Sequence, residues 1–244
     1  MSLPEHCILP DWPAPANVRA LQTTRHGGVS VAPYDSLNLG SHVGDAPLAV
    51  ARNRMLLNTL LPSEPVWLEQ VHGTDVANAD MAGCRVRADA CIARRRSSVC
   101  VVMTADCLPV LLCDERGTAV GAVHAGWKGL AAGVIEATVR EMAVEPDKLM
   151  AWLGPAIGPD AFEVGDEVRA AFVAADPLSA AAFAPGQSGK WYADIYTLAR
   201  LRLNALGITR IYGGDRCTYS EREQFFSYRR DGATGRMGSF IWLS

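Results

Sequence analysis

The chain has 244 residues, of which 49% are hydrophobic and 20% are charged, and its formal net charge is -3. This length supports one substantial hydrophobic core. The weakly acidic balance offers no basic surface for nucleic acid or for an anionic membrane. We therefore expect a single globular domain over residues 1–244, with a small molecule as its partner.

Nothing in the sequence indicates export or insertion into a membrane. Residues Met1–Cys7 contain neither a basic leader nor an apolar segment typical of a signal peptide. No stretch approaches the roughly 18 consecutive apolar residues of a membrane span. The seven cysteines are odd in number and irregularly spaced, which favours a reducing compartment over a disulfide framework. We expect a cytoplasmic protein.

Three apolar segments in the middle of the chain are predicted to be strands. Residues 98–103 and 108–113 have the length and the β-branched content of buried strands. Turn residues then lead into residues 119–124, which we predict to pair with the second of these strands. His124 would then stand at the end of a strand.

Two amphipathic helices are predicted after these strands. Apolar residues recur at helical spacing between positions 131 and 142, so His124 would also face a helix N-terminus, a common ligand site in α/β proteins. A second helix is predicted over residues 194–207, with Asp194 as its N-cap and Gly207 as its stop.

The remaining predicted elements are a loop and two late strands. Residues 180–189 are predicted to be a surface loop that ends in turn residues, and residues 208–212 and 239–242 to be strands. Because some strands are joined by turns and others through helices, we expect a mixed sheet in an α/β or α+β domain.

Three residues stand out as metal ligands or nucleophiles beside small neighbours: His72, Cys107 and His124. They are separated by 35 and 17 residues, which excludes a local zinc-finger clip. Two imidazoles and a thiolate from different elements are typical of a catalytic Zn²⁺ site whose fourth position is open to water or substrate. Copper is the less favoured metal.

Plainer roles for these residues remain open. A cysteine after an apolar strand is more often a small core residue than a ligand, and a histidine at a strand end is usually hydrogen-bonded and half-buried. A non-catalytic zinc-stabilised binding module would need a fourth ligand, for which Cys84, Cys91 and Cys100 are candidates.

Seven segments spread over nearly the whole chain resemble the bacterial YfiH family. They are TRHGGVS at 24–30, SLNLG at 36–40, WLEQVHG at 67–73, MTADCLPV at 103–110, VHAGWKG at 123–129, WLGPAIGP at 152–159 and FFSYRRD at 225–231. Members of this family have been called polyphenol oxidase or laccase-domain protein, purine nucleoside phosphorylase, and peptidoglycan editing factor.

The resemblance implies a zinc site at His72, Cys107 and His124. It implies a layered α-β-β-α sandwich similar to the cysteine-hydrolase domain of a deamidating toxin. It also implies phosphorolysis of adenosine, inosine and methylthioadenosine, with a separate adenosine deaminase activity. Lys128 stands where relatives often carry arginine, which keeps a cation but changes any bidentate contact.

Ligand supply disfavours multicopper laccase chemistry. A trinuclear copper cluster is held largely by imidazoles, and the chain has five histidines in all. A His₂Cys set with a weak axial methionine would suit a blue-copper site, but electron transfer alone would not reduce O₂. A zinc ion with an open position fits better, because it activates water for attack on adenine C6 or polarises a substrate group as the base departs.

Phosphorolysis also requires cations for the incoming phosphate. Arg25, beside two glycines, is the first candidate for such a catalytic role, and Lys128, near a helix N-terminus, is the second. Asn38 and Gln70 are candidates for substrate contacts, and Asp106 for orienting a metal ligand. Each has a plainer alternative: a surface salt bridge, a solvated side chain, or a turn or cap role.

Cys107 and His124 also allow a second class of enzyme. Without a catalytic metal they would act as nucleophile and base in an amidase that cleaves an acyl or peptide bond. That chemistry would suit the cell-wall editing label, with a UDP-linked muramyl amino acid as substrate.

Overall fold

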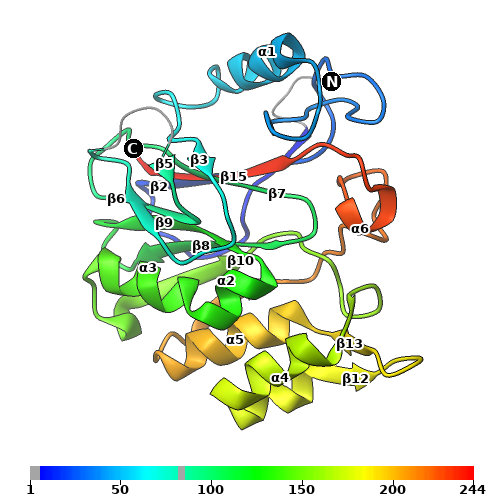
Figure 1. The fold of residues 1–244 in the computed structure, drawn as a ribbon. Helices are drawn as coiled ribbons and strands as arrows, with labels where there is room; N and C mark the ends of the chain where they lie inside the picture. The colour runs from blue at the N-terminus through cyan, green and yellow to red at the C-terminus, as the bar shows by residue number, and fades with distance from the viewer. Residues whose placement is uncertain (1–5, 82–85) are drawn as a thin grey trace.

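The computed structural model describes residues 6–81 and 86–244. Figure 1 shows two sheets stacked on one another, with helix α1 on the outer side of one sheet and helices α2 to α5 on the outer side of the other. This confirms the α/β fold and its α-β-β-α layering. The helices are α1 (Pro47–Leu57), α2 (Trp127–Ala132), α3 (Val134–Met142), α4 (Asp166–Ala175) and α5 (Ile195–Ala205). None in the described residues is long and apolar enough to cross a membrane.

The first sheet joins the two ends of the described chain. Its four antiparallel strands run in the order β1-β2-β15-β7. They are β1 (Cys7–Ile8), β2 (Val18–Thr23), β15 (Met237–Leu243) and β7 (Cys100–Thr104). The register pairs Thr104 with Met237, which places the end of β7 beside the start of β15.

The second sheet is mixed, as the sequence predicts. Its six strands run in the order β14-β10-β8-β9-β6-β4, with parallel pairing at β10–β14 and β4–β6 and antiparallel pairing between the inner strands. They are β14 (Arg210–Gly213), β10 (Leu149–Leu153), β8 (Leu108–Asp114), β9 (Val120–Ala125), β6 (Ala90–Ala93) and β4 (Val76–Asn78). The predicted pairing of the strands that contain residues 108–113 and 119–124 is confirmed.

Shorter elements complete the fold. Two small sheets contain β3 (Leu68–Glu69) with β5 (Val86–Arg87), and β11 (Glu163–Val164) with β13 (Trp191–Ala193) and β12 (Phe183–Pro185). Two 3₁₀ turns, η2 (Pro146–Lys148) and η3 (Pro177–Ala182), and a short helix, α6 (Tyr228–Asp231), lie in the connections.

Strand β9 shows how the sequence assigns its two faces. Val123 and Ala125 pack in the apolar layer against helices α2 to α5, whereas Val120 and Ala122 pack in the layer between the two sheets. Because side chains alternate along a strand, His124 shares the face of Val120 and Ala122. It therefore stands where the layer between the sheets reaches the ends of β9 and β7.

Two predicted elements differ from the structure. The helix predicted over residues 131–142 is divided between α2 and α3 at Gly133, whose φ of 97° interrupts the helical path. The loop predicted over residues 180–189 is wrong in its first half, where η3 and β12 form and Phe183 is buried near Phe172. Burial of this aromatic ring organises a segment whose alanines and turn residues are typical of a loop.

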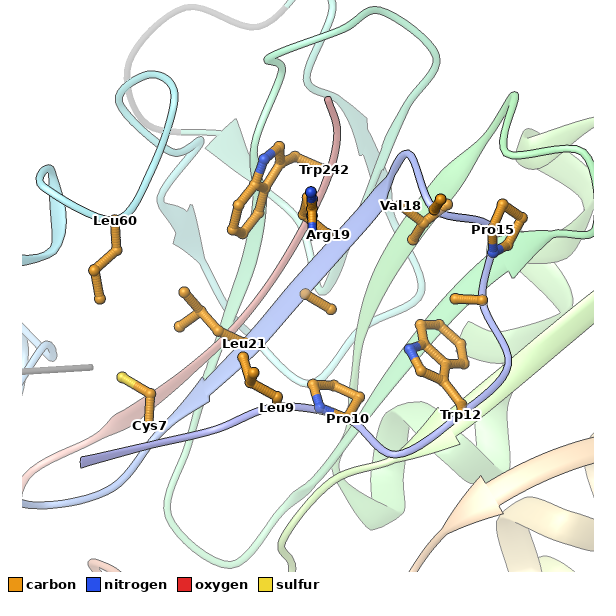
Figure 2. A pocket seen from close by; sticks show the side chains of 13 residues that line it. Cys7, Leu9, Pro10, Trp12, Pro15, Val18, Arg19, Leu21, Leu60 and Trp242 are labelled. Carbon is orange, nitrogen blue, oxygen red and sulfur yellow. The ribbon is translucent and has the colours of Figure 1, made fainter. Parts of the chain in front are cut away.

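A hollow of about 480 Å³ lies on the outer face of the first sheet. Figure 2 shows Leu21 and Trp242, from β2 and β15, in its middle, with Leu60 toward one side and Trp12 toward the other. It contains none of the predicted site residues, so the site must be sought elsewhere.

Candidate metal centre

His72, Cys107 and His124 meet in space although they come from three parts of the chain. His72 follows β3, Cys107 lies between β7 and β8, and His124 is in β9. Their ligand atoms all lie within 4.8 Å of one another, and the described residues contain no second group of this kind. His72 Nε2 is 3.7 Å from Cys107 Sγ, and the two imidazole rings pack edge to face with centroids 4.8 Å apart.

The carboxylate of Asp89 holds two of these three residues in place. Its Oδ1 accepts hydrogen bonds from the backbone N–H of His72 and from Nδ1 of His124, both at 2.8 Å. Its Oδ2 accepts from the backbone N–H groups of Val71 and Gly73, at 3.1 and 2.7 Å. The side chain is fully buried. Despite the cost of burial, the bonds from His124 and from the loop keep the pKa of Asp89 below its usual value.

These bonds explain the unusual backbone at His72. Its φ of 61° lies in the left-handed region, which non-glycine residues seldom adopt. Successive N–H groups from Val71 to Gly73 thereby converge on one carboxylate, in the manner of an anion-binding nest. The hydrogen bonds to Asp89 offset the strain of this left-handed backbone and fix the position from which the His72 side chain extends.

Asp89 also decides which nitrogen of His124 faces the centre. With Nδ1 bonded to the carboxylate, Nδ1 carries the proton and Nε2 is left for Cys107 or a metal ion. Gly126 provides the space for this cluster, because a Cβ there would lie 2.7 Å from His72 Cδ2 and 3.0 Å from Cys107 Sγ. Any larger residue would displace a candidate ligand.

The charges of Cys107 and His124 support one another. Desolvation disfavours the Cys107 thiolate, but the charge and hydrogen bonds of His124 and His72 outweigh it and lower the pKa of Cys107 to about 6. Desolvation likewise disfavours a charged His124, yet Cys107 and Asp89 raise the pKa of His124 to about 9. In metal-free protein these shifts favour a thiolate beside an imidazolium at neutral pH.

The three residues form one wall of a cavity of about 360 Å³. The other lining residues are His42, Gln70, Met103, Thr104, Ala105, Tyr228 and Arg236. Among the described residues that line it there is no carboxylate. A second, smaller cavity of about 180 Å³ is also lined by Cys107, with Trp127, Phe162 and Tyr228 among its other lining residues.

The donor set fits a zinc ion. Two neutral imidazoles and a thiolate are typical ligands for Zn²⁺ in a catalytic site. A carboxylate behind one imidazole, as Asp89 lies behind His124, is a common supporting arrangement in such sites. The cavity beside the three donors leaves room for a fourth ligand.

Among the other predicted site residues, Gln70 lines the cavity. Its amide donates to Met103 O and accepts from Met103 N, both at 2.8 Å, so it joins the loop of His72 to strand β7. Asp106 lies beside Cys107, but its carboxylate accepts from Thr218 Oγ1 and Arg229 N, both at 2.6 Å. Those bonds hold the C-terminal segment rather than a candidate metal ligand.

Arg25, Asn38 and Lys128 do not line the cavity that contains the three candidate ligands. The Arg25 guanidinium is paired with Asp35 and donates to backbone oxygens of residues 35 and 222. Asn38 is fully buried and bonds to neighbouring loops. Lys128 is exposed on α2, with Nζ 5.7 Å from the centroid of the Trp127 ring.

Two of the three cysteines considered as a fourth ligand do not join the group. Cys91 and Cys100 are fully buried in the layer between the sheets, and Cys84 lies outside the described residues. The role of Asp89 was missed because it is one carboxylate in the apolar segment Ala88–Ala93. The one sequence feature that could have indicated this role is a lone acidic residue directly before an apolar segment.

The family model described as multi-copper polyphenol oxidoreductase laccase matches residues 19–244. A protein from Shigella flexneri named purine nucleoside phosphorylase YfiH is 58% identical over 241 residues, which cover 97% of this chain and 98% of that protein. The chain belongs to the YfiH family. A Pseudomonas aeruginosa relative, purine nucleoside phosphorylase PA4543, is 56% identical over 97% of this YfiH-family chain and 98% of its own length.

A solved structure has the same fold as this YfiH-family chain. The crystal structure of Neisseria meningitidis protein NMB0706 superposes with a TM-score of 0.93 at 54% identity, covering 98% of this chain and 99% of that one. The layered arrangement of Figure 1 is therefore shared with a protein whose structure was determined by crystallography.

The first prediction concerns Asp89. We expect Asp89→Asn to weaken zinc binding about 10- to 100-fold, as is typical when a supporting partner of a metal ligand is lost. An amide offers one acceptor atom, whereas each carboxylate oxygen here receives two N–H groups. Competition with a chromophoric chelator measures the affinity. Asp75→Asn, an exposed change near the same loop, is the matched control; equal affinities in the two variants would contradict the role given to Asp89.

The second prediction concerns the Cys107 thiol. Its pKa of about 6 means that the reactive thiolate persists at pH values where an ordinary cysteine is protonated. In metal-free protein, alkylation of Cys107 by iodoacetamide should therefore reach half its maximal rate near pH 6. Mass spectrometry of the Cys107 peptide measures this rate, with Cys107→Ala as background. A midpoint near that of a free thiol would show that the neighbouring imidazoles do not stabilise the thiolate.

Proposed function

We propose that the chain is a zinc-dependent purine nucleoside phosphorylase acting on adenosine, inosine and methylthioadenosine, with an additional adenosine deaminase activity. The observation that carries this proposal is the convergence of His72, Cys107 and His124 on the wall of a cavity. Relatives that are 58% and 56% identical over nearly the full chain bear the name purine nucleoside phosphorylase.

In this proposal His72 Nε2, Cys107 Sγ and His124 Nε2 hold the ion. The bound Zn²⁺ supplies a Lewis acid that polarises a substrate group or lowers the pKa of a water molecule. Asp89 keeps the His124 ring oriented and its Nδ1 protonated. Because the thiol must stay reduced to serve as a ligand, we also propose a cytoplasmic location.

The two cavities that meet at Cys107 suit the parts of a nucleoside. In phosphorolysis, a phosphate oxygen bonds to ribose C1′ while the bond from C1′ to the purine nitrogen breaks. The site must therefore hold an anion, a sugar and a flat base together. The smaller cavity offers the rings of Trp127, Phe162 and Tyr228 to a base, and the larger offers polar groups to the sugar and the anion.

The decisive test is the incubation of purified protein with inosine, with and without phosphate. We expect about one zinc per chain and release of hypoxanthine and ribose 1-phosphate only when phosphate is present. Cys107→Ala should lose both the zinc and the release, because it removes one of three ligands. Cys217→Ala, a change at another half-buried cysteine, is the control. Release that proceeds unchanged without phosphate would rule out phosphorolysis.

One observation favours a second candidate. Cys107, His124 and Asp89 form a series of thiol, imidazole and carboxylate, the order found in enzymes that use a cysteine nucleophile. An amidase that edits UDP-linked muramyl amino acid precursors would use Cys107 to attack the acyl carbon.

The two candidates respond differently to metal removal. The amidase would turn over a UDP-muramyl amino acid after chelation and would form an acyl-thioester on Cys107 that mass spectrometry detects. The phosphorylase would lose activity on chelation and regain it with Zn²⁺. If chelation abolishes hydrolysis of the muramyl substrate and zinc restores it, a metal-free amidase mechanism is wrong.

Laccase chemistry, named in the family description, is less well supported by the ligands. Of the five histidines, only His72 and His124 belong to the candidate metal group. The rings of His6 and His26 pack against each other elsewhere, with centroids 5.6 Å apart. Two histidine ligands are few for a trinuclear copper cluster.

A further inference from the structure

Arg236 is the cation that faces the candidate metal centre. It lines the same cavity as His72, Cys107 and His124. In residues 6–81 and 86–244 no ion pair involves it. Desolvation lowers the pKa of Arg236, and the nearby Cys107 partly opposes this. A half-buried guanidinium without a carboxylate partner is expected to bind an anion.

The guanidinium is anchored on one side and open on the other. Its Nη1 donates to Thr234 O and Gly235 O, both at 3.0 Å. Its Nε and Nη2 donate to no atom of the described residues. These two groups form the edge of the fork that binds carboxylates and phosphates in a bidentate manner.

The loop of Asn38 fixes the position of this arginine. Asn38 Oδ1 accepts from Arg236 N at 2.9 Å, and Leu39 N donates to Arg236 O at 3.1 Å. At Gly40 a Cβ would lie 2.7 Å from Arg236 Cγ, so only glycine leaves room for the side chain. Asn38, predicted from the sequence as a substrate contact, thus acts as a positioning residue for Arg236.

An independent observation on the neighbouring strand points to the same ligand. Thr104 is 1% exposed and lines the cavity, yet its Oγ1 has no hydrogen-bond partner. A buried hydroxyl without a partner is costly unless a ligand or water completes it. Thr104 pairs across the sheet with Met237, the residue after Arg236. The unpartnered hydroxyl and the open guanidinium therefore lie at adjacent strand ends.

His42 lines the same cavity as Arg236 and Thr104. Partial burial, together with the charges of Arg236, Arg54 and His124, lowers the pKa of His42. Neutral His42 can still donate one hydrogen bond through a ring nitrogen. A tetrahedral oxyanion would meet three kinds of donor here: guanidinium, hydroxyl and imidazole.

We propose that Arg236 and Thr104, with His42, form a phosphate subsite beside the metal centre. It rests on the proposed function, because its natural occupant would be the inorganic phosphate consumed in phosphorolysis. The subsite replaces Arg25 and Lys128 as the source of phosphate contacts, since neither of them lines this cavity. Bound phosphate would balance the positive charge of the guanidinium and accept a hydrogen bond from the Thr104 hydroxyl.

The test is calorimetric titration of zinc-loaded protein with inorganic phosphate in the absence of nucleoside, so that no turnover contributes to the heat. Arg236→Gln should raise the Kd for phosphate about 10- to 100-fold, as expected for a lost charge-assisted bidentate contact. Thr104→Val, which removes only the hydroxyl, should raise it about 3- to 10-fold, and Thr104→Ser should restore it. Zinc content should be unchanged in all three.

Controls separate this effect from loss of charge or of fold. Lys190→Met removes an exposed cation from the turn before β13 and should leave the Kd for phosphate unchanged. Arg236→Lys keeps the charge but not the fork, so it should fall between wild type and Arg236→Gln. If Arg236→Gln does not fold, Arg236→Lys and Thr104→Val still decide the question.

The outcomes distinguish the subsite from the proposed function. If phosphate affinity is the same in wild type, Arg236→Gln and Thr104→Val, the subsite is wrong even when wild type releases hypoxanthine. If both variants weaken phosphate binding but wild type releases no hypoxanthine, the subsite holds and phosphorolysis fails. If inosine monophosphate binds while inosine excludes free phosphate, the anion belongs to a nucleotide and the assignment to inorganic phosphate is overturned.

Discussion

The carboxylate of Asp89 is the group on which the candidate centre depends. An isolated buried carboxylate is strongly unfavourable, and this one is tolerated because four N–H groups surround its two oxygens. The same four bonds draw the loop of His72 against strand β9 and set the tautomer of His124. One side chain thus brings two distant segments of the chain together and places a candidate metal ligand from each in the same centre.

Much of the fold follows from patterns that are local in the sequence. The β8–β9 hairpin and the helix capped by Asp194, whose carboxylate accepts from the N–H groups of residues 196 and 197, were predicted because short-range periodicity and capping determine them. Helix α1 was missed, since its buried residues do not form a clear apolar stripe and its N-cap Ala46 makes no side-chain bond. Tertiary burial, which a local pattern does not reveal, stabilises it.

The site was predicted in part for a similar reason. The sequence identified His72, Cys107 and His124 by their chemistry and their small neighbours, and these side chains do converge. It gave no indication of which cation would face them, because Arg236 and Thr104 become neighbours only through the β7–β15 pairing. Arg25, chosen for its adjacent glycines, instead joins its own loop to the segment before α6. Residue type was enough to select three side chains that converge, whereas long-range pairing decides which charges surround them.

The position of β15 also bears on how the protein is made. This strand is the last of the described elements to be synthesised, yet it lies between β2 and β7 in the first sheet. Until it emerges from the ribosome, β2 and β7 each have an apolar edge without a partner, the kind of surface that promotes aggregation. The strand follows directly after Arg236. The pairing that closes the sheet therefore also brings Arg236 beside Thr104, so the first sheet and the proposed phosphate subsite depend on the same strand.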